Sequence, residues 1–208
     1  MAQSSYAGVI AWVDWQSTAP AVSGTITLAD ASQISVTFDG GIIGACLDST
    51  CSNHWLPAST YQSATVDNAP PGGLLEITGG GGVTPDVYTI TFGTPVVDPV
   101  IGIVSMGGGV TSEYDFSAPY TLLSSGGGFY GSGSFTVVSP TALQGAESNG
   151  VVGFTGTFSS ISFAAPVYEA WQEITVGVPD PQTVPEPGAW SLMLAGMGLL
   201  GVYRLKRR

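Results

Sequence analysis

Few side chains in this sequence could carry chemistry, and the single histidine is the first candidate. His54 could act as the base of a Ser-His-Asp triad, which also needs a positioned nucleophile. No Gly-x-Ser-x-Gly nucleophile elbow accompanies it, and the stretch from Gly131 to Gly133 is only a superficial match. We therefore predict no catalytic residue, and we interpret His54 as a histidine on an exposed loop.

Two pairs of carboxylates are the next candidates. Glu113 and Asp115 are two residues apart in a predicted strand, so both side chains lie on one face. Glu169 and Glu173 would also share a face in an extended segment. Such pairs could bind calcium, or could act as the acid and nucleophile of a glycosidase when about 5–10 Å apart. We favour a simpler interpretation for both pairs, which is that they lie on solvated faces.

Cys46 and Cys51 are separated by four residues, and His54 follows shortly after. Together they could ligate a metal, but no fourth ligand is evident and zinc sites usually show paired spacings. In an exported protein a small disulfide loop is the expected state. We predict a Cys46–Cys51 disulfide, no metal and no cofactor.

Aromatic residues on glycine-rich loops are candidates for ligand contact. Trp55, Phe129 and Tyr130 could stack on sugar rings, because aromatic faces bind the apolar surfaces of sugars. The alternative is that these side chains fold back over the edge of the domain. The glycine runs themselves are predicted to be turns, since no lysine precedes position 206 to complete a phosphate-binding loop.

Charge is distributed very unevenly along the chain. The only basic residues apart from His54 are Arg204, Lys206, Arg207 and Arg208, while all 15 acidic residues precede them. Such an acidic body has no groups with which to neutralise phosphates, which excludes nucleic acid as a partner. It should also avoid anionic lipid surfaces. Hydrophobic residues make up 44% of the chain, which favours a packed core over disorder despite 30 glycines.

The elements that must position these residues are short strands. Residues 33–38 alternate apolar and polar side chains, the pattern of a half-buried antiparallel strand. Residues 100–106 are apolar on both faces, so we expect a central strand there. Residues 44–71 are long and polar, and we predict a loop region. The predicted strands span residues 6–15, 24–28, 33–38, 74–78, 86–92, 100–106, 112–116, 120–123, 133–138, 150–158, 160–163 and 169–176.

This pattern predicts an all-β fold, an antiparallel β-sandwich of jelly-roll or Greek-key type, followed by a single C-terminal hydrophobic helix. We place the sandwich at residues 1–177 and a proline-rich linker at 178–184. The first ten residues show neither a charged nor an apolar signal region, so we expect the natural start to lie further upstream.

The tail has three parts, namely Pro185-Glu186-Pro187, an uncharged apolar run from Ala189 to Tyr203, and a basic end. As a helix the apolar run would be about 22 Å long, at about 1.5 Å per residue. That is short for a hydrocarbon core about 30 Å thick, but thinning of the bilayer and snorkelling of the basic residues would allow it to span. The basic end would then stay in the cytoplasm and the acidic body outside.

The order of these parts resembles the PEP-CTERM sorting signal of Gram-negative bacteria. The resemblance covers residues 184–208 and implies that Pro185, Glu186 and Pro187 are recognised by an exosortase, which cuts near them. It also implies transient anchoring in the inner membrane, followed by delivery to the cell surface or to the exopolysaccharide matrix. The body resembles, more loosely, a group of PEP-CTERM proteins with a divergent β-sandwich of unassigned activity.

Three functions are compatible with these observations. The first is a non-enzymatic surface or matrix protein, and it requires only the fold and the tail. The second is a carbohydrate-binding module, with or without calcium, which predicts an exposed aromatic platform or a carboxylate cluster. The third is a glycan hydrolase, which needs a cleft with two facing carboxyls, one of them with a raised pKa. We favour the first, with the second as the alternative.

Overall fold

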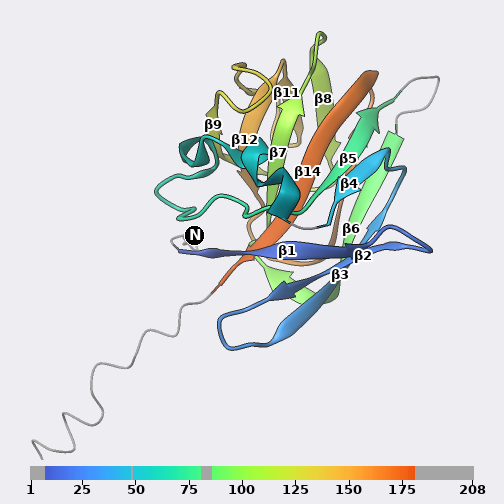
Figure 1. Cartoon of the computed structure of the whole chain (residues 1–208). Helices are drawn as coiled ribbons and strands as arrows, with labels where there is room; N and C mark the ends of the chain where they lie inside the picture. Colours follow the sequence, from blue (N-terminus) through green and yellow to red (C-terminus); the bar gives the residue numbers. More distant parts are fainter. Residues whose placement is uncertain (1–7, 48, 81–85, 181–208) are drawn as a thin grey trace, which may run out of the picture.

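The computed structural model describes residues 8–47, 49–80 and 86–180. Its strands form two packed antiparallel layers, as the alternating sequence pattern predicts (Figure 1). The strands are β1 (Ile10–Ser17), β2 (Val22–Thr27), β3 (Gln33–Asp39), β4 (Gly44–Cys46), β5 (Leu74–Gly79), β6 (Asp86–Val97), β7 (Val100–Met106), β8 (Ser112–Phe116), β9 (Thr121–Gly126), β10 (Thr136–Val137), β11 (Ala142–Gly145), β12 (Ser148–Gly153), β13 (Thr157–Ala165) and β14 (Glu169–Pro179).

Strand β1 belongs to both layers. Its first residues pair with β14, which continues the layer through β7 and β12 to β9. Its later residues pair with β2, which continues the other layer through β3, β6, β13, β8 and β11 to β10. The first layer also includes β5, which pairs with β14, and β4, which pairs with β5. The β-sandwich predicted from the sequence is confirmed.

The main core lies between the two layers, and a second core lies on the outer face of the β14 layer. Strand β7 contributes to both, with Ile101 and Ile103 facing the inner core and Val100 and Val104 facing the outer one. This explains why residues 100–106 are apolar throughout, and it confirms the central strand predicted there.

The long segment predicted as a loop supplies the cover of this outer core. It contains β4 and two 3₁₀ helices, η1 (Ser49–Trp55) and η2 (Ala58–Tyr61), which lie against the β14 layer (Figure 1). Trp55 and Tyr61 of this segment are buried, and their rings pack edge to face with centroids 5.1 Å apart. Gly102 of β7 makes room for the indole, because a Cβ there would lie 3.1 Å from Trp55 Cζ3. The segment is therefore a structural layer, and the prediction of a simple loop was wrong.

Several predicted strand boundaries also needed correction. The strand predicted at residues 150–158 is divided between β12 and β13, and the break includes Gly156 with a φ of +125°. Asn149 lies within β12, so this strand begins before the predicted residue 150. The strand predicted at 133–138 is reduced to β10, and β11 was missed. Strand β14 continues to Pro179, two residues into the predicted linker, because its end pairs with Ile10 of β1.

The predicted tail lies outside the described residues, including Pro185, Glu186, Pro187, the apolar run and the basic end. Among residues 8–47, 49–80 and 86–180, no helix is long and apolar enough to cross a bilayer.

Candidate functional site

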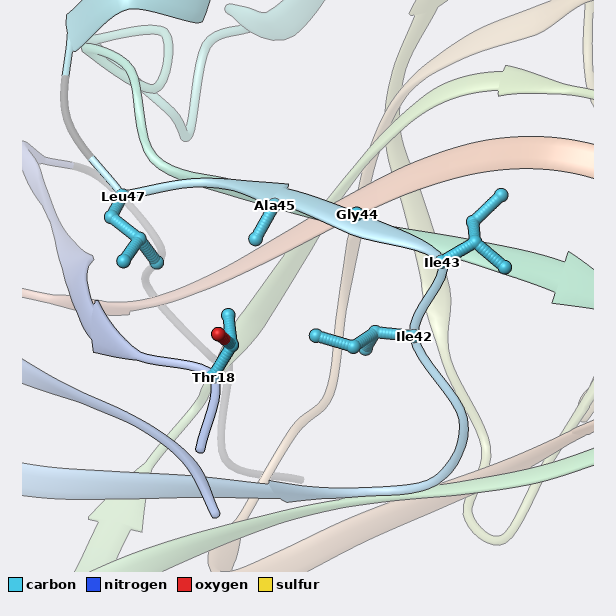
Figure 2. Close-up of a pocket in the computed structure, with 6 residues that line it drawn as sticks. All are labelled: Thr18, Ile42, Ile43, Gly44, Ala45 and Leu47. Atoms are coloured by element: carbon cyan, nitrogen blue, oxygen red, sulfur yellow. The ribbon is translucent and has the colours of Figure 1, made fainter. Parts of the chain in front are cut away.

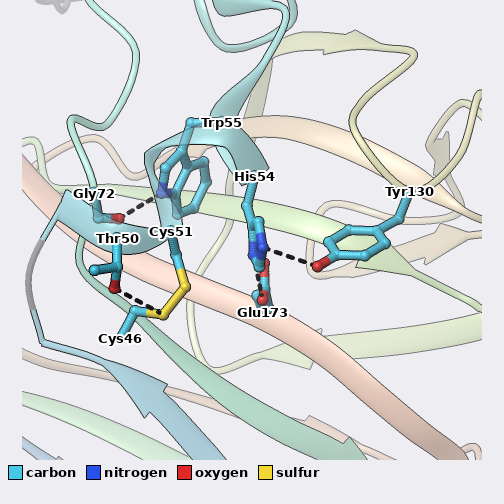
Figure 3. Close-up of a disulfide and its surroundings, with 8 residues drawn as sticks. All are labelled: Cys46, Thr50, Cys51, His54, Trp55, Gly72, Tyr130 and Glu173. Atoms are coloured by element: carbon cyan, nitrogen blue, oxygen red, sulfur yellow. Dashed lines mark hydrogen bonds and ion pairs between the residues drawn. A yellow bond between two sulfur atoms is a disulfide. The ribbon is translucent and has the colours of Figure 1, made fainter.

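The candidate site is built on η1, next to a disulfide. Cys46 and Cys51 are joined, as predicted, and link β4 to η1 (Figure 3). The indole Nε1 of Trp55 donates to the carbonyl of Gly72, which anchors the end of η1. Tyr61 Oη donates to the carbonyl of His54 at 3.2 Å. These contacts fix the backbone from which the His54 side chain extends over β14.

His54 is the middle member of a chain of three hydrogen-bonded side chains. His54 Nδ1 lies 2.8 and 3.0 Å from the two carboxylate oxygens of Glu173, and His54 Nε2 lies 2.8 Å from Tyr130 Oη (Figure 3). Glu173 comes from β14 and is fully buried, whereas Tyr130 comes from the segment that joins β9 to β10. The side chain of His54 is only 13% exposed, so the prediction of an exposed loop histidine was wrong.

A second glutamate faces this chain. Glu76 of β5 is the direct cross-strand partner of Glu173, so two like charges would lie on neighbouring strands. Burial raises the pKa of Glu173 to about 8, and the negative charge of Glu76 adds to the rise. Burial lowers the pKa of His54, while Glu76 opposes that shift. At pH 7 the His54–Glu173 pair therefore holds one shared proton and has no net charge.

The shared proton fixes the direction of the outer hydrogen bond. If the proton is on Glu173, the carboxyl donates to Nδ1 and the neutral imidazole carries its hydrogen on Nε2. If it is on His54, both ring nitrogens carry hydrogens. In both cases Nε2 donates to Tyr130 Oη, and the hydroxyl hydrogen of Tyr130 can donate to a ligand. Once the pair has lost its shared proton, Nδ1–H donates to the ionised Glu173 and Nε2 accepts from Tyr130 instead.

Exposed aromatic rings surround the outer end of this chain. Phe129 stacks on the His54 ring with centroids 5.4 Å apart, and it is 52% exposed. Tyr130, 42% exposed, packs edge to face on His54, on Phe129 and on Trp171 of β14. We call His54, Phe129, Tyr130, Trp171, Glu76 and Glu173 the aromatic–acidic cluster. Phe129 and Tyr130 were predicted from the sequence to be contact residues, and Trp171 was not.

The structure separates the remaining predicted residues from this cluster. Trp55 is only 1% exposed, so the prediction that it contacts a glycan was wrong. Glu113 is half-buried and accepts from Gln144 Nε2 at 2.7 Å, and Asp115 is exposed on the same strand, β8. The described residues contain no group of three His, Cys, Asp or Glu side chains arranged to hold a metal.

Glu169 was also predicted on a solvated face and is instead 2% exposed. Its carboxylate accepts from the backbone N–H groups of Gly107 and Gly108, at 2.8 and 2.6 Å, in the turn after β7. Burial raises its pKa, although these amide donors oppose the rise. The prediction failed for Glu173 because η1 places His54 over it, and for Glu169 because a register shift follows it in β14 and its carboxylate binds the turn after β7.

A groove of about 400 Å³ lies beside β4, and none of the residues of the aromatic–acidic cluster lines it (Figure 2). Ile42, Ala45 and Leu47 line it opposite Thr18, and Ile43 is 54% exposed at its margin. None of these side chains is titratable, so the groove offers no acid, base or nucleophile.

Comparisons with known proteins identify the tail. No curated protein matches the chain. Among solved structures, the chain is similar to CBM32 of AlyQ in complex with 4,5-unsaturated mannuronic acid, with 14% identity over 66% of this chain and 95% of that one. The TM-score of that superposition is 0.28, which is too low to inform function. Residues 183–208 match the model of the PEP-CTERM protein-sorting motif, which implies export with processing by an exosortase. This chain therefore carries a PEP-CTERM protein-sorting motif at its carboxyl end.

Proposed function

We propose that the protein is an exported, non-enzymatic component of the cell surface or of the exopolysaccharide matrix. The observation that carries this proposal is the sorting motif at residues 183–208. Three features of the body support it. The body has no lysine or arginine, so cytoplasmic nucleic acids are excluded as partners. Its only two cysteines form a disulfide, as expected in an oxidising compartment. It also consists mainly of antiparallel strands.

The absence of activity is part of the proposal and rests on burial. Glu76 and Glu173 face each other across two strands, and Glu173 has the raised pKa of a general acid. However, Glu173 is fully buried and both of its carboxylate oxygens contact His54. A general acid must come within hydrogen-bond reach of the glycosidic oxygen, and this carboxyl has no open path to one.

The sorting step can be tested in a bacterium that contains an exosortase. The wild-type chain should lose its tail near residues 185–187, and the body should be recovered outside the inner membrane. Glu186→Ala removes the central residue of the motif, so the uncut chain should accumulate in the inner membrane. Asp115→Ala, a substitution at an exposed residue of the body, should be processed like wild type. Recovery of intact wild-type protein in the cytosol with reduced Cys46 and Cys51 would contradict the proposal.

A second candidate function is glycan binding at the aromatic–acidic cluster. The observation that favours it is the exposure of Phe129 and Tyr130 beside Trp171, in contact with the polar chain from Tyr130 to Glu173. Exposed aromatic faces combined with a few fixed polar groups are typical of binding sites for small polar ligands. The rings would pack on the apolar face of a sugar, while Tyr130 Oη and Glu76 would bind its hydroxyl groups.

Glycan arrays with and without calcium test this candidate. Binding should be saturable and should be lost in Phe129→Ala and in Trp171→Ala. Tyr168→Ala serves as the matched control, because Tyr168 is 61% exposed and has no ring contact with the cluster. Equal binding by all three variants would place the glycan elsewhere, and release of reducing sugar would contradict the non-enzymatic assignment.

A further inference from the structure

The electrostatic surroundings of the aromatic–acidic cluster restrict the ligand that it can accept. No lysine or arginine precedes Arg204, so the described body offers no such cation to pair with a bound anion. His54 is the one side chain of the cluster that could become cationic, and it already contacts Glu173 with one ring nitrogen and Tyr130 with the other. An anionic sugar at this surface would therefore meet the carboxylate of Glu76 and no counter-charge.

Glu76 supplies the negative charge nearest to the exposed rings. It is half-buried, and its carboxylate lies directly over Gly44 of β4, where any Cβ would collide with it. Burial raises the pKa of Glu173 and of Tyr130, and the negative charge of Glu76 adds to both shifts. The charge of Glu173 also adds to the shift of Tyr130. Glu76 is thus held between β4 and Glu173, and Glu173 is linked through His54 to the exposed Tyr130.

We propose that the aromatic–acidic cluster binds glycans that carry free amino groups, with the ammonium held between Glu76 and the exposed faces of Phe129 and Tyr130. The proposal rests on the second candidate function, glycan binding at the same rings, and it names the class of sugar. An ammonium gains both from the carboxylate and from the negative face of an aromatic ring. A hydroxyl or acetamido group at the same place can donate a hydrogen bond to the carboxylate but adds no charge attraction, and a uronate carboxylate is repelled.

The protonation states of its own side chains suit this site to select ligands by charge. Burial raises the pKa of Glu173 and lowers the pKa of His54, so both shifts favour the neutral forms and the pair supplies no cation to offset Glu76. Tyr130 accepts from His54 Nε2 and keeps its own hydroxyl hydrogen for a sugar oxygen. One carboxylate, one hydroxyl donor and two ring faces thus match an ammonium, a neighbouring oxygen and an apolar sugar face.

Calorimetry on the detergent-solubilised full chain tests the inference. The probes are short oligomers of glucosamine, the same oligomers fully N-acetylated, and oligomers of uronic acid, at a pH where the amines are protonated. The glucosamine oligomer should bind about tenfold more tightly than its acetylated form, and the uronate oligomer should not bind. Raising the salt from about 0.01 M to about 1 M should remove most of this preference, because the Debye length falls from about 30 to about 3 Å.

Two isosteric variants locate the effect. Glu76→Gln should reduce the preference for glucosamine to about twofold, because binding of the charged oligomer should weaken much more than binding of the acetylated oligomer. Asp115→Asn removes an exposed charge from the opposite layer and should behave like wild type. The basic tail of the full chain favours anionic glycans, so it works against the expected result.

The outcomes separate this inference from the function on which it rests. Equal affinity for the two glucosamine forms, or binding of the uronate, overturns the amino-glycan inference and leaves glycan binding standing. No binding of any probe, with Phe129→Ala and Trp171→Ala indistinguishable from wild type on the array, overturns both. A salt-independent preference in wild type also contradicts the inference, whether or not Glu76→Gln folds.

Discussion

Strand β14 carries two buried glutamates four residues apart, and the two are held in different ways. Glu169 accepts hydrogen bonds from the backbone amides of Gly107 and Gly108. Glu173 contacts an imidazole that contacts an exposed tyrosine in turn. Backbone amides are fixed donors that cannot titrate, whereas His54 can take or give a proton. Glu169 thus acts as a structural clamp on the turn after β7, and Glu173 sets the protonation of a surface cluster.

The largest expected effect comes from removing the clamp. Glu169→Ala leaves two backbone N–H groups of the turn without their acceptor and opens a cavity beside Tyr114, which is fully buried. We expect a loss of about 3 kcal/mol in the free energy of unfolding, measured by urea denaturation at pH 7. Asp115→Ala, on an exposed face, should change it by less than about 0.5 kcal/mol. A loss below about 1 kcal/mol for Glu169→Ala would show that the turn does not depend on this carboxylate.

The second prediction concerns pH and distinguishes the two glutamates. The pKa of Glu173 rises from 4.5 to about 8 on folding, so between these values the folded chain keeps a proton that the unfolded chain has lost. Stability from this residue is therefore fully present below pH 4.5 and is lost as the pH rises toward 8. The depressed pKa of His54 acts in the opposite sense, but only at and below about pH 6.5.

Glu173→Gln isolates this contribution. The amide can donate to His54 Nδ1 as the protonated carboxyl does, and it does not ionise. From pH 6.5 to pH 8 the wild type should lose about 2 kcal/mol more stability than the variant, measured by urea denaturation at several pH values. Parallel pH profiles for the two proteins would show that Glu173 is already ionised at pH 6.5.

The smallest effect should come from the cross-strand partner. Glu76→Gln removes one of two like charges on directly opposed residues. We expect little change in stability at pH 7, where Glu173 is protonated, a gain of up to about 1 kcal/mol above pH 8, where both wild-type carboxylates are charged, and a lower pKa for Glu173. The shift can be followed by NMR from the side-chain carboxyl carbon of Glu173. A destabilised variant would mean that the carboxylate of Glu76 makes a favourable contact that its charge repulsion does not outweigh.

The sequence was sufficient for the sandwich and insufficient for the site. Residues 86–92 alternate, and Tyr88, Ile90 and Phe92 are buried as that period requires. The same alternation led us to predict Glu169 and Glu173 on a solvated face. Alternation shows which residues of a strand share a face, but it does not show whether another segment covers that face. Glu173 is covered by the segment of residues 44–71, whose polar composition concealed the buried anchors Trp55 and Tyr61. Glu169 is covered by the turn after β7, and the register shift that follows it in β14 was not visible in the sequence.

The cluster itself could not be assembled from the sequence. It joins η1, β5, β14 and the segment after β9, and the sequence separations of its hydrogen bonds are 119 residues for His54–Glu173 and 76 for Tyr130–His54. Trp171 was missed because it lies in a strand rather than on a glycine-rich loop. One signal was present in the sequence, since Glu173 interrupts an otherwise uncharged run that continues to Pro179. A lone acid in such a run suggests a buried partner, and His54 was the only histidine available.

The central claim is that the sorted body remains in the matrix through its aromatic–acidic cluster. The most direct measurement is the distribution of the processed protein between purified exopolysaccharide and culture medium, for wild type and for the double variant Phe129→Ala/Trp171→Ala. We predict that the wild type is retained with the polysaccharide, and that the double variant is exported and cut equally well but recovered in the medium. Equal retention of the two processed proteins would contradict the claim.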